Sequence, residues 1–130
     1  RTRRQARMLE LVRRMLPDLG EPLMLTLNRD VVCGRHKDGA NTSDYSYILF
    51  FNDFDSNYTG GELVTEEPGG DRVLSEKNVW HRFCGRDHVH YNLPQTGTKY
   101  SIVAYSQSNA AAAKKGSTRR AAASAAQEHV

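Results

Sequence analysis

YILFF, residues 47–51, is apolar at every position, and the turn-forming residues Asn52 and Asp53 follow it directly. A strand with one face in water alternates polar and apolar residues, whereas a continuous apolar run of this length is typical of a strand buried on both faces. We therefore expect residues 45–51 to form a central strand with other structure packed on each of its faces.

Short runs of β type surround this strand from residue 23 to residue 106. Asp-Gly, Asn-Asp, Gly-Gly and Gln-Thr-Gly turns separate them, and no helical pattern interrupts them. The predicted strands are residues 23–27, 31–33, 45–51, 62–65, 72–74, 79–83, 88–93 and 100–105. Regular strands without intervening helices argue against a βαβ sheet and favour a mainly β fold, an antiparallel jelly roll of two sheets.

The two ends of the chain differ from this β-rich part. Residues 2–16 place apolar side chains on one helical stripe and most arginines on the other side, and Pro17 and Gly20 stop the helix. After Ser106 the sequence is Ala-rich and has little to bury. We expect an amphipathic helix packed on the core in 1–22, the β core in 23–106, and a flexible tail or linker in 107–130.

Composition restricts the setting of the protein. The chain of 130 residues suffices for one core, and its two cysteines have no paired spacing, which indicates a reduced, intracellular compartment, cytoplasm or nucleus. No run approaches the roughly 20 apolar residues of a membrane span, so we expect no membrane association. The net charge of +3 mildly favours anionic partners. Because the chain begins at Arg1, we expect a part of a longer polypeptide, and its oligomeric state stays open.

Three residues form a candidate metal site. His36 and Asp38 are two positions apart, so their side chains leave the same face of an extended backbone, and His90 begins a later strand. Two histidines and one carboxylate bind one face of iron(II) and leave three positions open. The sequence predicts an iron(II) site of His36, Asp38 and His90. His88 competes with His90 for the third place, and the offset to Pro94 favours His90.

Lys99 and Ser101 follow on the last predicted strand, where the two-residue period puts both on one face. An organic acid that chelates a metal through one end needs a cation and a hydroxyl at its other end. We therefore expect Lys99 and Ser101 to bind the far carboxylate of a co-substrate.

In this order the motifs resemble those of the iron(II)- and 2-oxoglutarate-dependent dioxygenases. The matching stretches are HKD at 36–38, GGEL at 60–63, WHRFCG at 80–85, HYNLP at 90–94 and GTKYS at 97–101. The resemblance covers roughly residues 23–106 and implies a double-stranded β-helix, a fold of the jelly-roll type.

The resemblance also implies the roles of the site residues. His36, Asp38 and His90 would bind iron(II), and Lys99 with Ser101 would bind 2-oxoglutarate. Dioxygen would be the co-substrate with which the enzyme hydroxylates a C–H bond. Most members carry arginine at the position of Lys99, although prolyl hydroxylases use lysine, so the activity of the lysine form stays open.

The resemblance leaves the substrate open between a nucleic-acid base and a protein side chain. Asn41 completes a His-x-Asp-x-x-Asn motif that resembles the methylcytosine and thymine dioxygenases, whereas GGEL at 60–63 resembles the prolyl hydroxylases. We expect loops 39–45 and 52–60 to flank the mouth of the site. Asn41, Tyr45 and Tyr58 are the candidates for substrate contacts.

Two alternatives remain at this stage. One is a cupin-like metal-binding jelly roll that pairs His88 with His90 and uses no 2-oxoglutarate. The other is a catalytically silent interaction module built on a degenerate oxygenase fold.

Overall fold

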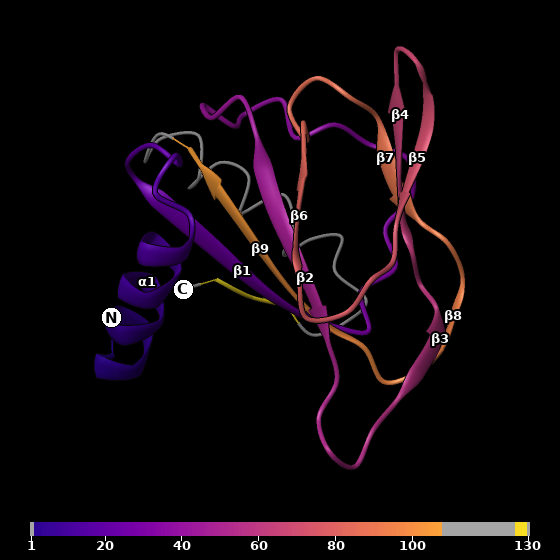
Figure 1. Ribbon diagram of the computed structural model, residues 1–130, viewed down its shortest axis with the longest axis horizontal. Coiled ribbons are helices and arrows are strands. Elements are labelled where there is room, and N and C mark those ends of the chain that lie inside the picture. Colours follow the sequence, from indigo (N-terminus) through magenta and orange to yellow (C-terminus); the bar gives the residue numbers. More distant parts are fainter. Residues whose placement is uncertain (1, 108–126, 130) are drawn as a thin grey trace.

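Two antiparallel layers make up the computed structural model, which describes residues 2–107 and 127–129 (Figure 1). The larger layer is a five-stranded sheet in the order β10-β1-β9-β2-β6. Its strands are β1 (Leu23–Arg29), β2 (Ser46–Phe51), β6 (Trp80–Phe83), β9 (Tyr100–Ser106) and β10 (Gln127–His129). The mainly β prediction is confirmed.

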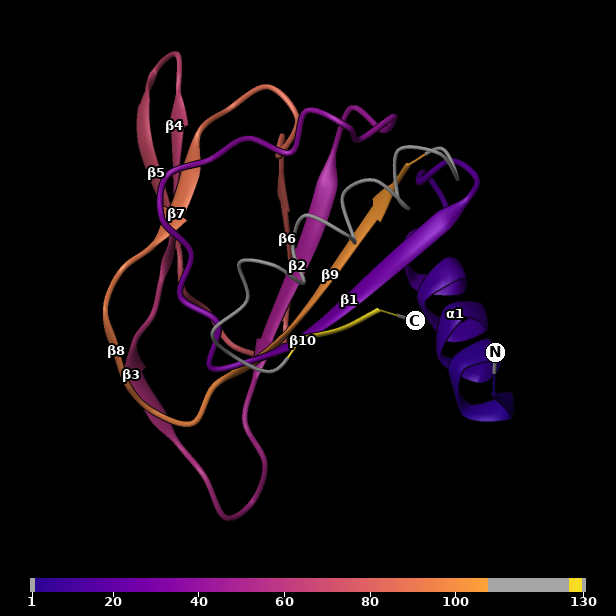
Figure 2. The ribbon, with the colours of Figure 1, turned by 180° about the vertical axis from the view of Figure 1, so that it is seen from behind.

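The second layer is a three-stranded sheet in the order β5-β4-β7, continued by the two-stranded ribbon β3-β8. Its strands are β3 (Tyr58–Gly60), β4 (Leu63–Glu67), β5 (Gly70–Leu74), β7 (His90–Asn92) and β8 (Gln95–Gly97). Figures 1 and 2 show this layer on one side of the larger sheet and helix α1 (Arg3–Met15) on the other side. The larger sheet is therefore the middle of three layers.

Strand β2 lies inside the larger sheet, between β9 and β6. Its alternate residues Ile48 and Phe50 pack with Leu63 and Leu74 of the smaller sheet, while Tyr47 packs against the helix side. Both faces of the strand are covered, which confirms the expectation from its continuous apolar sequence.

The helix forms where the sequence predicts it. Thr2 caps its first turn, and Thr2 and Gln5 make the reciprocal pair of hydrogen bonds known as a capping box. The buried residues Leu9 and Val12 pack on Leu25 of β1, which is fully buried. The helix thereby covers the outer face of β1 and β9 and leaves the inner face of these strands for the cavity.

The inner face of β1 and β9 is unusually polar. Because side chains alternate along a strand, Leu25 faces the helix whereas Thr26 and Asn28 face the opposite way, and all three are buried. Ser101 pairs with Asn28 across the two strands. Buried polar groups are costly unless they are bonded, so this face is suited to a polar ligand rather than to a dry core.

Residues 31–33, predicted as a strand, form none. Asp30 has a φ of 54° and turns the chain out of the sheet, and its carboxylate accepts hydrogen bonds from the Lys99 N–H and the Gln95 amide. The following residues run as an irregular segment beside β7, where the Asn92 N–H donates to the Cys33 carbonyl. A turn that depends on hydrogen bonds to residues far along the chain cannot be predicted from a count of apolar residues.

Residue 107 and residues 127–129 depart from the predicted flexible tail. Gln107 is buried and forms an isolated bridge with Asn41, and Gln127–His129 pair with β1 as strand β10. Residues 108–126 lie outside the described part of the chain, so the rest of this expectation stays a prediction.

Arg72 of β5 connects the two layers at the outer edge of β6. Its guanidinium donates to the Arg82 carbonyl at 2.6 Å and to Glu67 at 2.9 Å. Over the described residues, no helix is long and apolar enough to cross a membrane.

Replacing Gly60 with alanine is expected to lower the free energy of unfolding by about 1–3 kcal/mol. Gly60 has a φ of +72°, and a Cβ there would lie 2.2 Å from the Pro94 carbonyl oxygen. Urea denaturation measures the change. Gly69→Ala is the matched control because no atom lies within 4 Å of its Cβ position. Equal effects of the two substitutions would contradict the prediction.

Candidate metal centre

His36 and His90 are brought together by the backbone. They form an isolated antiparallel bridge in which each N–H donates to the other carbonyl, at 3.1 Å and 2.9 Å. Residues exchanging both hydrogen bonds lie directly opposite each other, so their side chains project to the same side. The two imidazole centroids are 4.2 Å apart. An irregular segment therefore places the first histidine beside the strand that carries the second.

Asp38 completes the group. Its N–H donates to the Gly85 carbonyl at 2.7 Å. Its carboxylate lies 3.2 Å from Nε2 of His90 and 3.8 Å from Nε2 of His36. One ligand atom from each of the three residues lies within 4.8 Å of the others. Ligands at right angles on a metal with bonds of about 2.1 Å are about 3 Å apart, so this spacing suits one ion.

The hydrogen bonds of the two imidazoles set the tautomer that a metal requires. Nδ1 of His36 lies 2.7 Å from the Gly34 carbonyl, and Nδ1 of His90 lies 3.0 Å from the His88 carbonyl. A carbonyl only accepts, so each Nδ1 is placed to donate its proton there, and each Nε2, on the side of Asp38, is the nitrogen available to bind a metal. The residues present therefore fit a divalent metal such as iron(II).

Gly85 keeps room for the carboxylate. A Cβ at this position would lie 3.2 Å from Oδ2 of Asp38 and 3.2 Å from the Phe83 ring. The Phe83 ring in turn packs edge-on against His90, with centroids 5.3 Å apart. The sequence motif that ends in Gly85 thus packs around the candidate metal ligands Asp38 and His90.

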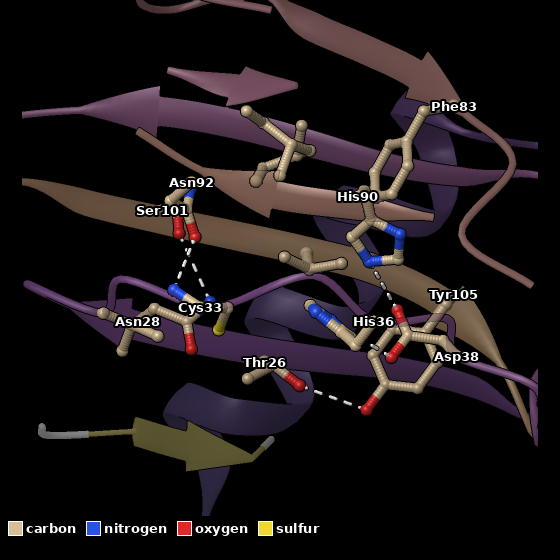
Figure 3. A pocket seen from close by; sticks show the side chains of 14 residues that line it. Thr26, Asn28, Cys33, His36, Asp38, Phe83, His90, Asn92, Ser101 and Tyr105 are labelled. Atoms are coloured by element: carbon tan, nitrogen blue, oxygen red, sulfur yellow. Dashed lines mark hydrogen bonds and ion pairs between the residues drawn. The ribbon is translucent and has the colours of Figure 1, made fainter. Parts of the chain in front are cut away.

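A cavity between the two layers contains the three ligands. Its lining comes from both layers and from the 31–38 segment: Thr26, Asn28, Val31, Cys33, His36, Asp38, Ile48, Leu63, Phe83, His90, Asn92, Ser101, Val103 and Tyr105. Figure 3 shows His36, Asp38 and His90 at one end, and Asn28, Cys33, Asn92 and Ser101 at the other. A ligand in this cavity could therefore contact a metal held by the three residues at one end and the polar side chains at the other end.

Ser101 lines the far end of the cavity, whereas Lys99 is not among the lining residues. Ser101 accepts a hydrogen bond from the Asn28 amide at 3.2 Å. The Lys99 side chain is 3% exposed, and its ammonium donates to the Gly61 carbonyl at 2.6 Å. Burial lowers the pKa of Lys99, whereas negative charge at Cys33 and other neighbouring groups acts in the opposite direction. Because Cys33 lines the cavity, the Lys99 ammonium is within electrostatic reach of its far end.

The three predicted substrate residues lie outside the cavity lining. Asn41 is buried and bonded, as its amide donates to Ser46 at 3.3 Å and accepts from Gln107 at 3.0 Å. Tyr45 is 45% exposed and packs under the Arg82 guanidinium at 4.4 Å. Tyr58 is half-buried and lines a separate pocket with Gly61 and Lys77.

His88 does not join the metal ligands. It lies in the turn before β7 and lines a separate groove together with Tyr45, Trp80 and Arg82. The paired His88–His90 ligands of the cupin-like alternative are therefore absent from the described residues.

Thr26, Asn28 and Tyr105 are cavity residues that the sequence analysis missed. Thr26 and Tyr105 share a hydrogen bond of 3.1 Å across the sheet. A signal was present, because Thr26 and Asn28 alternate with leucines in a strand whose other face is apolar. Polar residues on the inner positions of a buried strand indicate a ligand face.

The comparisons with known proteins bear on the fold. No protein-family model matches the sequence, and no curated protein matches it. The structure is similar to the crystal structure of an oxidoreductase of the 2OG-Fe(II) oxygenase family from Burkholderia pseudomallei, with a TM-score of 0.51 at 19% identity. The match covers 74% of this chain and 56% of that chain. The chain thus has the predicted double-stranded β-helix fold with an N-terminal helix, and it carries a His-Asp-His triad in the cavity between the two layers of that fold.

Proposed function

We propose that this chain is the core of an iron(II)- and 2-oxoglutarate-dependent dioxygenase. The observation that carries the proposal is the triad of His36, Asp38 and His90, whose ligand atoms lie within 4.8 Å of one another in a cavity with a polar far end. Two histidines and one carboxylate are the facial ligand set of non-haem iron oxygenases, and the similar fold of a 2OG-Fe(II) oxygenase supports the same reading.

The residues of this chain would hold and orient the reactants. When bound, iron(II) and 2-oxoglutarate supply the oxidation: dioxygen converts 2-oxoglutarate to succinate and carbon dioxide, and its second oxygen atom enters a substrate C–H bond as hydroxyl. His36, Asp38 and His90 would hold the metal, with both imidazole rings oriented by their Nδ1 hydrogen bonds. The apolar side chains of Ile48, Leu63 and others would exclude water from the site.

The far end of the cavity suits the second carboxylate of 2-oxoglutarate. Ser101 supplies a hydroxyl, and the Asn28 amide has a polar group left over because only one of its two ends is bonded within the described residues. The Lys99 ammonium has three N–H donors, of which one goes to the Gly61 carbonyl. A carboxylate at this end would pair with the positive charge of Lys99 and accept hydrogen bonds from its remaining N–H donors.

The proposal is tested by mixing the protein with iron(II) and 2-oxoglutarate without oxygen, and then admitting air. We expect the weak visible charge-transfer band of the iron(II)–2-oxoglutarate chelate in the first step. In the second step we expect slow succinate release even without a substrate. A protein that binds iron(II) but gives neither signal would contradict the proposal and favour a silent interaction module.

Replacing Lys99 with methionine is expected to weaken 2-oxoglutarate binding about 10- to 100-fold, since a hydrogen bond to a charged group contributes about 1.5–3 kcal/mol. Calorimetric titration of the manganese(II)-loaded protein measures the affinity. Lys77→Met is the matched control, because the Lys77 ammonium bonds Asn57 and stacks on Tyr58 outside the cavity. Unchanged affinity in a folded Lys99→Met variant would remove Lys99 from the co-substrate site.

Among the predicted substrate residues, Tyr45 has the most support. It is exposed, and its groove shares the Phe83 side chain with the metal cavity. For Asn41 we propose a structural role instead, because the hydrogen bond between its side-chain amide and Gln107 holds the loop after Asp38 in place. Tyr58 stays a prediction. Whether the substrate is a nucleic-acid base or a protein side chain is a question for assays with both.

A further inference from the structure

A cysteine lies inside the cavity at the end where the co-substrate's far carboxylate would bind. Cys33 lines the cavity beside Asn28 and Ser101 (Figure 3). Two backbone hydrogen bonds to Asn92 hold it there. Its N–H donates to the Asn92 side-chain oxygen at 3.0 Å, and its carbonyl accepts from the Asn92 N–H at 2.9 Å. The backbone of Cys33 is therefore held against strand β7.

A buried cation lies within electrostatic reach of Cys33. The Lys99 side chain is 3% exposed and interacts electrostatically with Cys33, so little solvent screens the attraction. A cation near a thiol promotes nucleophilic attack by its sulfur, because the thiolate is the attacking species.

A second observation shows that this end of the cavity is prepared for a ligand. Asn28 is 8% exposed, lines the same end, and its side-chain oxygen has no partner among the described residues. A buried amide with an unmet hydrogen bond costs stability unless a ligand or water meets it. Any group added to the Cys33 sulfur would therefore occupy the same end of the cavity as a ligand bound to Asn28.

We infer that Cys33 is a peroxide-sensitive modification site, and that its oxidised form excludes the acidic co-substrate from the far end of the cavity. The identity of the excluded ligand rests on the proposed function, whereas the reactivity of the Cys33 thiol does not depend on it. Reversible oxidation at this position would make the enzyme respond to the peroxide level of its surroundings.

The modification step needs hydrogen peroxide as the oxidant. The Cys33 thiolate attacks one peroxide oxygen, the O–O bond breaks, an S–O bond forms, and hydroxide leaves and takes up a proton. Sulfur loses two electrons and peroxide gains them, which gives a sulfenic acid and water. A thiol reductant reverses the step: two reductant thiols become a disulfide, water leaves, and Cys33 returns to the thiol.

Cys84 provides an internal control, since the sequence contains two cysteines. It lines the groove on the other side of Phe83 and lies 3.5 Å from the Asp87 carboxylate, to which its thiol donates. The hydrogen-bond partner of the Cys84 thiol is a carboxylate, whereas Cys33 has a lysine ammonium within electrostatic reach. The two thiols of one molecule thus differ in the sign of a charge that acts on them.

The reactivity is tested on the reduced protein before any iron is added. The protein is exposed to hydrogen peroxide with dimedone, which traps sulfenic acids, and the adducts are located by peptide mass spectrometry. We expect about tenfold more adduct at Cys33 than at Cys84. Lys99→Met should remove this preference and Lys99→Arg should retain it. Equal labelling of both cysteines, or a preference that survives Lys99→Met, would overturn the inference.

The effect on binding is tested separately with manganese(II) and 2-oxoglutarate in a calorimeter. Peroxide treatment should abolish binding to the Cys84→Ser variant, and dithiothreitol should restore it, whereas the Cys33→Ser variant should keep its own affinity after the same treatment. Undiminished binding to protein that carries the Cys33 sulfenic acid would overturn the inference. Absence of binding to the reduced protein would instead overturn the proposed function, with the dimedone result still deciding the reactivity of Cys33.

Discussion

Replacing His90 with glutamine is expected to lower the affinity for iron(II) by more than about a hundredfold and to abolish succinate release. Removing only a supporting outer group of a metal ligand already costs about 10- to 100-fold. His90 is itself a proposed ligand, and it also holds His36 opposite by the pair of backbone hydrogen bonds. Glutamine keeps the volume and the backbone but loses the imidazole nitrogen that faces Asp38. Anaerobic titration with iron(II), followed by the chelate band, measures the loss.

His88→Gln is the matched control for this prediction. The residue lies two positions earlier in the same segment, but it faces the groove with Tyr45 and Arg82. We expect it to retain iron binding. Loss of iron binding in both variants would point to unfolding of the segment before β7, and loss in His88→Gln alone would show that the triad is wrongly assigned.

Replacing Phe50 with alanine is expected to lower the free energy of unfolding by about 3–5 kcal/mol. The ring is 1% exposed and packs between the layers against Leu63 and Leu74. Its truncation leaves a cavity next to the Lys99 ammonium, which lies 5.4 Å from the ring centroid. The ammonium would lose a contact with the ring, so 2-oxoglutarate affinity should fall as well.

Phe54→Ala is the control with the same change of side chain. Phe54 lies four positions later in the loop after β2 and is fully exposed, so its truncation should change stability by less than about 0.5 kcal/mol. Urea denaturation of the two variants measures both values. Similar losses in the two variants would mean that Phe50 does not carry the packing between the layers.

The central strand and the triad could be predicted because each leaves a local mark on the sequence. A continuous apolar run marks a strand covered on both faces, and β2 has Ile48 and Phe50 on one side and Tyr47 on the other. His36 and Asp38 are spaced for one face of an extended segment. The nearness of His90 to this pair is a matter of topology, and it was inferred from the ligand set of a facial iron site and from the resemblance of the whole set of motifs.

The parts that the sequence did not reveal depend on contacts between distant residues. Asp30 leaves the sheet because its carboxylate accepts from Lys99 and Gln95, which lie far along the chain. The ribbon β3-β8 has little apolar sequence, and it pairs Thr59 with Thr96 through their hydroxyls. Asn41 was predicted as a substrate contact because it completes a His-x-Asp-x-x-Asn motif, and its hydrogen bond to Gln107, far along the chain, leaves no mark on that motif. Such pairs become visible only when the chain is folded.

The contact between Arg72 and the Arg82 carbonyl has a consequence for how molecules of this protein meet. Strand β6 ends the larger sheet, and an unguarded edge strand invites pairing with another chain. Arg72 occupies the outward carbonyl of Arg82 and places a positive charge over the edge. A second copy would have to displace this guanidinium before its own strand could attach. A neutral residue at position 72 would leave the edge of strand β6 open to pairing with another chain. The first effect of such a substitution would be aggregation at high protein concentration rather than a change at the metal site.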